Sequence, residues 1–61
     1  MPTDETRRLL RIFGIAVTNY EDAVNEGAPQ EKIREAETEA LLRLREIQTL
    51  LERLETAVKK L

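Results

Sequence analysis

The chain has 61 residues, of which 36% are charged and 41% hydrophobic, with a formal net charge of −2 and few aromatic side chains. It contains no cysteine and no histidine, which excludes disulfide bonds, thiolate or imidazole metal sites, thiol nucleophiles and histidine general bases. We therefore expect one helical domain over residues 1–61, with no enzymatic activity, catalytic residues, cofactor or metal.

The N-terminal part of the sequence predicts a first helix over about residues 4–26. Thr3 is a suitable N-cap, and Asp4 and Glu5 follow in the first turn, where negative charge interacts favourably with the helix dipole. Apolar side chains then recur at helical spacing and predict a core-facing stripe. The stripe consists of Leu9, Phe13, Ala16, Val17, Tyr20 and Val24, with Leu10, Ile12 and Ala23 at its borders.

Two glycines interrupt the helical pattern, and they have different contexts. Gly27 precedes Ala28 and Pro29, an order typical of a helix end, a short turn and a helix start, because glycine accepts a left-handed conformation and proline suits the first helical position. Gly14 lies inside the first helix and off its stripe. Two interpretations of Gly14 stay open: close approach of another backbone, or a tolerated surface glycine.

The C-terminal part predicts a second helix over about residues 29–61, because it is rich in strong helix formers and contains no further glycine or proline after Pro29. From Ala40 onward its apolar residues follow a heptad pattern. Leu44, Leu51 and Val58 occupy a positions, and Ala40, Ile47, Leu54 and Leu61 occupy d positions. Leu41 and Leu50 at e and g widen this face, which favours a four-helix bundle over a two-stranded coil.

The unequal lengths of the two helices indicate a partner chain. In an all-α antiparallel hairpin, residues at the same level have numbers summing to about 55, so nothing in the chain faces the last apolar residues of the second helix. We therefore expect a second copy to cover them, giving a homodimeric four-helix bundle or coiled coil. The predicted dimer interface comprises Leu44, Ile47, Leu50, Leu51, Leu54, Val58 and Leu61.

Charge is distributed unevenly along the chain. Residues 18–40 contain seven acidic and two basic side chains, whereas the rest of the chain contains five acidic and eight basic ones. A hairpin with this sequence has an acidic turn and a basic open end. Antiparallel association places unlike charges together, so it is favoured over parallel association.

Two small sets of residues are candidates for contacts with other molecules. Arg7, Arg8 and Arg11 form a basic cluster on the first helix, which predicts either phosphate contacts or a solvated face that meets an acidic partner surface. Ile15 and Leu42 are predicted to project away from the core, which makes them candidates for a docking patch on another protein or simply isolated surface residues.

These observations favour a small, non-enzymatic homodimer that acts as a protein–protein interaction or structural module. Two alternatives stay open: a nucleic-acid-binding regulator that uses the three arginines, and a chaperone-like or antitoxin-like subunit that completes its core with a different chain. The sequence has no apolar run long enough for a membrane span and no signal-peptide pattern, which predicts a cytoplasmic location without membrane partners.

Overall fold

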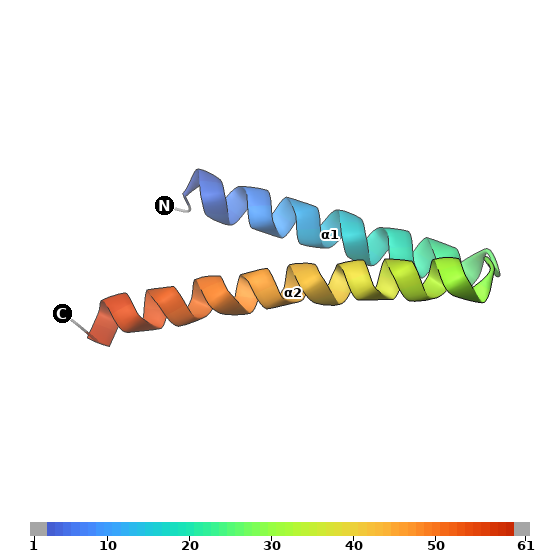
Figure 1. Ribbon diagram of the computed structural model, residues 1–61. Coiled ribbons are helices and arrows are strands. Elements are labelled where there is room, and N and C mark those ends of the chain that lie inside the picture. The colour runs from blue at the N-terminus through green and yellow to red at the C-terminus, as the bar shows by residue number, and fades with distance from the viewer. Residues whose placement is uncertain (1–2, 60–61) are drawn as a thin grey trace.

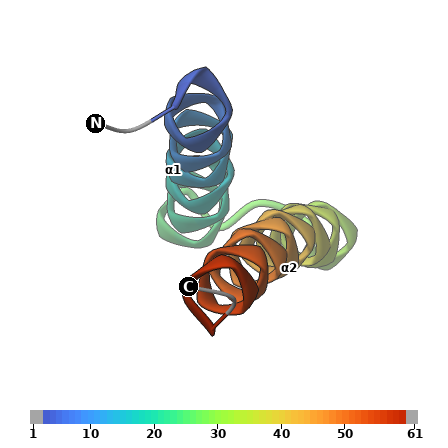
Figure 2. The same cartoon turned by 90° about the vertical axis from the view of Figure 1, so that its left-hand side faces the viewer.

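A computed structural model describes residues 3–59 of the chain, which form a hairpin of two antiparallel helices (Figure 1). Helix α1 spans Asp4–Asn25 and helix α2 spans Gln30–Lys59, and no strand occurs among the described residues. The all-helical hairpin expected from the sequence is confirmed. The molecule is a rod of 49 × 18 × 12 Å, and the view along it in Figure 2 shows two helices side by side with no third layer.

Helix α1 begins as its sequence predicts. Thr3 has an extended backbone, and its side-chain oxygen accepts a hydrogen bond from the backbone N–H of Thr6 at 3.1 Å, which satisfies one of the free donors of the first turn. Asp4 and Glu5 lie in that turn, at the positive end of the helix dipole. The helix ends at Asn25, one residue before the expected boundary.

The turn between the helices is a Schellman motif. Gly27 has φ +66°, and its N–H donates to the carbonyl of Val24 at 3.2 Å, while the N–H of Ala28 donates to the carbonyl of Ala23 at 3.0 Å. The carbonyl of Pro29 accepts the first hydrogen bonds of α2, from Lys32 and Ile33. Pro29 is thus the N-cap and not the first helical residue, so α2 begins one residue later than expected.

Two polar contacts fix the register of the hairpin. The hydroxyl of Tyr20 donates to Oε2 of Glu37 at 3.5 Å, and Arg53 forms an ion pair with Glu5. Residues at the same level therefore have numbers that sum to 57 or 58, two or three more than expected. As a consequence, α1 begins level with Leu54, and only the last turn and a half of the described part of α2 extends beyond it.

The contact between the helices is narrow. Its buried side chains are Leu9 and Ala16 from α1 and Ala40 and Leu50 from α2. Ile12, Phe13, Tyr20, Ala23, Ile33, Ala36 and Ile47 are half-buried around them. A core with four buried side chains is small even for a chain of this length, for which a lone core seldom supplies more than ~3–5 kcal/mol.

The apolar stripe predicted for α1 is only partly in this core. Val17 and Val24 were expected in the stripe, but they are 40% and 49% exposed. The physical reason is that a single neighbouring helix covers only the strip centred on Leu9 and Ala16, and both valines lie beside that strip. The prediction for Val17 and Val24 is therefore wrong for the hairpin alone.

Candidate interaction surface

One side of the hairpin carries a row of exposed apolar side chains, which we call the apolar face. On α1, the members of this row follow one another at intervals of seven residues, or about two helical turns, and therefore share a side of the helix. On α2 they occupy a positions of the heptad, with Leu41 at an e position and Leu54 at a d position. The apolar face consists of Leu10, Val17 and Val24 on α1 and Leu41, Leu44, Leu51, Leu54 and Val58 on α2.

The two rows lie on the same side of the hairpin. Successive residues advance by about 100° around a helix. Leu10, Val17 and Val24 are therefore rotated away from the buried line of Leu9 and Ala16, all in the same direction around α1. On α2, Leu41, Leu44 and Leu51 are displaced in the same direction from the line of Ala40 and Ile47, whereas Leu54 and Val58 continue that line at and beyond the start of α1. Because the helices run antiparallel, equal rotations bring both rows to the same side. The contact of Tyr20 with Glu37 lies on this side, at the edge of the α2 row.

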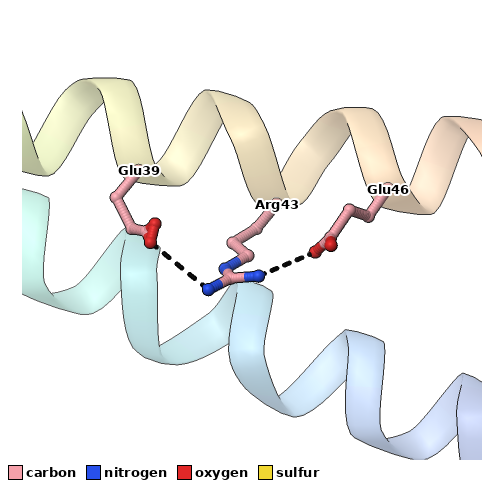
Figure 3. Close-up of polar contacts among 3 residues, drawn as sticks. All are labelled: Glu39, Arg43 and Glu46. Carbon is pink, nitrogen blue, oxygen red and sulfur yellow. Dashed lines mark hydrogen bonds and ion pairs between the residues drawn. The ribbon is translucent and has the colours of Figure 1, made fainter.

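The opposite side of the hairpin is polar. Arg43 reaches from α2 toward α1 between two glutamates of its own helix, with 3.3 Å to Glu39 and 3.1 Å to Glu46 (Figure 3). The hydrogen bond to Glu46 and the negative charges of both glutamates raise the pKa of Arg43 above its ordinary value, so this side chain stays charged at any pH at which the fold persists. The ion pair of Arg53 with Glu5 lies on the same side.

The amount of exposed apolar surface is large for a monomer. Eight residues of the apolar face are between 37% and 67% exposed, with Leu44 the least and Val58 the most exposed. The chain exposes 5248 Å² in total, whereas a compact monomer of this mass exposes about 4,100 Å². Its radius of gyration is 14.6 Å, against about 10–11 Å for a compact chain of equal length. The excess area is comparable to the ~800 Å² that each partner buries in a typical specific interface.

The structure divides the predicted dimer-interface residues into two groups. Leu44, Leu51, Leu54 and Val58 belong to the apolar face and are exposed. Leu50 is 9% exposed and Ile47 is half-buried, and both are covered by α1 of the same chain. These two residues therefore pack between the helices of the hairpin. Leu61 lies outside the described residues.

The heptad pattern alone does not predict which of the interface residues pack within the hairpin and which stay exposed. In α2 the d and g positions Ala40, Ile47 and Leu50 face α1, while the a positions Leu44 and Leu51 face away from it. A heptad pattern shows which apolar residues share a side of the helix. It does not show whether α1 of the same chain or a second chain covers each of them. On α1, the seven-residue spacing of Leu10, Val17 and Val24 was visible in the sequence, but it was merged with the core stripe.

The five candidate contact residues outside the apolar face are exposed, and the structure does not gather them into one patch. Arg7, Arg8, Arg11, Ile15 and Leu42 are all exposed. Arg8 shares a shallow depression of about 270 Å³ with Glu5, Glu46 and Arg53, where its charge is balanced. Arg11 and Ile15 line a second depression, and Leu42 lines a third, on α2.

No group of three potential metal-ligating side chains is present among residues 3–59. Neither α1 nor α2, within the residues described, is apolar enough over a sufficient length to cross a membrane. No protein-family model, curated protein or solved structure matches the chain.

Proposed function

We propose that the protein is a non-enzymatic, homodimeric four-helix bundle that serves as a protein–protein interaction or structural module, and that its apolar face is the dimer interface. The observation that carries this proposal is the apolar face, which has members on both helices and is left exposed within residues 3–59. A single exposed leucine is ordinary on a protein surface, but a contiguous row of this size marks an interaction site.

The energetics of the hairpin support the same proposal. Its four buried side chains leave the chain close to the limit of independent stability. Fully burying an exposed aliphatic side chain contributes ~1.5–3 kcal/mol. The residues of the apolar face are about half exposed, so covering the face adds stability comparable to that of the hairpin core. Two hairpins that pack through these faces form a bundle with Ala40, Ile47 and Leu50 inside each chain, and with the a and e positions and Leu54 between chains.

The proposal is tested by two leucine substitutions on α2. Leu51→Asp places a charge in the proposed interface, and Leu42→Asp places the same charge at a similarly exposed leucine on the other side of the hairpin; the two residues are 58% and 49% exposed. We expect sedimentation equilibrium to give a dimer for the parent chain and for Leu42→Asp, and a monomer with reduced helicity for Leu51→Asp. A dimer that survives Leu51→Asp as well as Leu42→Asp would contradict the proposal.

The same measurement separates the proposal from a subunit that completes its core with a different chain. Such a subunit is poorly folded in isolation and becomes helical only with its partner.

For the nucleic-acid alternative, the relevant assay is a salt titration of binding, because phosphate contacts weaken steeply as salt rises. The neighbours of Arg8 include two carboxylates, Glu5 and Glu46, which does not favour a phosphate site there.

A further inference from the structure

We propose that the second copy docks on the apolar face in antiparallel orientation, with α1 against α1 and α2 against α2, and with the two-fold axis at the level of Leu44. This inference rests on the proposed function, since it specifies how the homodimer is built. It identifies the partner as another copy of this chain and assigns a position to each residue of the apolar face.

The orientation follows from the charges that the fold brings together. The hairpin gathers residues 18–40 at the turn, where seven acidic and two basic side chains give a net charge of −5. The remaining residues have five acidic and eight basic side chains, and the fold places most of them toward the open end (Figure 1). Antiparallel docking sets the acidic end of each copy beside the basic end of the other, whereas parallel docking sets like beside like.

The position of the axis follows from two separate observations. First, two copies of α2 overlap along the whole of their described length when the axis crosses near the middle of Gln30–Lys59, which lies between Leu44 and Arg45. Leu44 is on the apolar face, so the two copies of this residue meet at the axis.

The second observation comes from α1. The hairpin register places Leu44 level with residues 13 and 14 of α1. Leu10 and Val17 lie on either side of that level, so the same axis brings Leu10 of each copy against Val17 of the other. The overlap of α2 and the apolar spacing of α1 therefore agree on one axis, although neither was used to derive the other.

This arrangement gives the end of α2 a specific environment. Leu54 and Val58 lie beyond most of α1 in their own chain and are 53% and 67% exposed. In the antiparallel dimer they reach the first turns of α2 in the partner, at about residues 30–35, beside the turn. On the outer edge of the α1 pair, Arg7 of each copy comes level with Glu21 of the other, and both side chains are exposed in the hairpin.

Two single-cysteine variants test the orientation, because the natural chain contains no cysteine. A disulfide requires the two Cα atoms to lie within about 4.4–6.8 Å. Leu44→Cys stands at the axis, so we expect it to link the two copies efficiently on oxidation. The two copies of Val58→Cys are separated by about 40 Å along the bundle at 1.5 Å per residue, so this variant should not link.

A charge exchange tests the predicted contact between chains. Arg7→Glu and Glu21→Arg should each weaken the dimer about two- to tenfold at low salt, because each places like charges together at two symmetric sites. The double variant Arg7→Glu with Glu21→Arg should regain parental affinity. The control is Arg8→Glu with Glu21→Arg, which has the same net charge but places the reversed arginine on the polar side, so it should not regain affinity.

The possible results distinguish an incorrect orientation of the dimer from an incorrect proposed function. Linkage of Leu44→Cys, absence of linkage for Val58→Cys and rescue by the Arg7 and Glu21 exchange are the results expected. Linkage of Val58→Cys, or a dimer in which neither cysteine links, would overturn the orientation or the axis while the homodimer stands. A parent chain that sediments as a monomer would overturn the proposed function itself.

Discussion

At the level of single residues, Arg43 shows how this small core tolerates a charge. Its side chain lies between the helices and is 29% exposed, while Glu39 and Glu46, which pair with it, are 45% and 41% exposed. Ion pairs with such exposed partners contribute only ~0–1 kcal/mol each. Because the aliphatic stem of a half-buried arginine usually lies along apolar surface, most of the contribution of Arg43 should come from packing.

This interpretation predicts different effects for two substitutions of Arg43. Arg43→Ala removes both the stem and the charge and should lower the free energy of unfolding by about 1–2 kcal/mol. Arg43→Met keeps a stem of similar length and should cost less than about 1 kcal/mol. Urea unfolding followed by circular dichroism measures both values, and equal losses for the two variants would show that the ion pairs, not the packing, stabilise the hairpin.

Gly27 and Gly14 allow the turn geometry to be tested with matched substitutions. Gly27 has φ +66°, a conformation that costs an L-residue about 1–2 kcal/mol, so Gly27→Ala should destabilise the protein by about that amount. Gly14 does not have positive φ, and an added Cβ would meet no atom of the chain within 4 Å. Gly14→Ala should therefore stabilise the helix by up to about 1 kcal/mol. Thermal unfolding of both variants tests this, and a large loss for Gly14→Ala would instead place another backbone at that site.

At the level of elements, local signals predicted both ends of α1 and the start of α2 to within one residue, and the expected end of α2 at residue 61 lies outside the described residues. The N-cap Thr3 and the left-handed Gly27 act through their immediate neighbours, which is why their roles were visible in the sequence. The side of each helix that faces the other could not be predicted in the same way. Val17 and Leu44 belong to periodic apolar patterns, but two faces of a helix can share one heptad, and the choice between them depends on tertiary packing.

The C-terminal part of α2 provides a prediction at this scale. Leu54 is 53% exposed in the hairpin but lies in the proposed interface, so Leu54→Asp should cost about 2–3 kcal/mol of stability per chain. Thr56→Asp introduces the same charge two residues away on the outer side of α2 and should have a much smaller effect. The measurement is thermal unfolding at two protein concentrations, and similar losses for both variants would mean that Leu54 is exposed in the functional state.

For the whole molecule, the rod shape, the small buried core and the apolar face all support the proposal that each chain supplies half of a bundle. The all-helical hairpin was predictable because helix ends and the turn are specified locally. The α2 part of the apolar face was largely contained in the predicted interface, but the α1 part was not predicted, because it emerges only when the two helices are oriented against each other.

The most direct test of this account is sedimentation equilibrium of the unmodified chain, combined with circular dichroism over the same concentration range. A homodimer should have twice the 7.1 kDa mass of one chain, and its helicity should fall as dilution dissociates it. A chain that stays fully helical while it sediments as a 7.1 kDa monomer at all concentrations would contradict it.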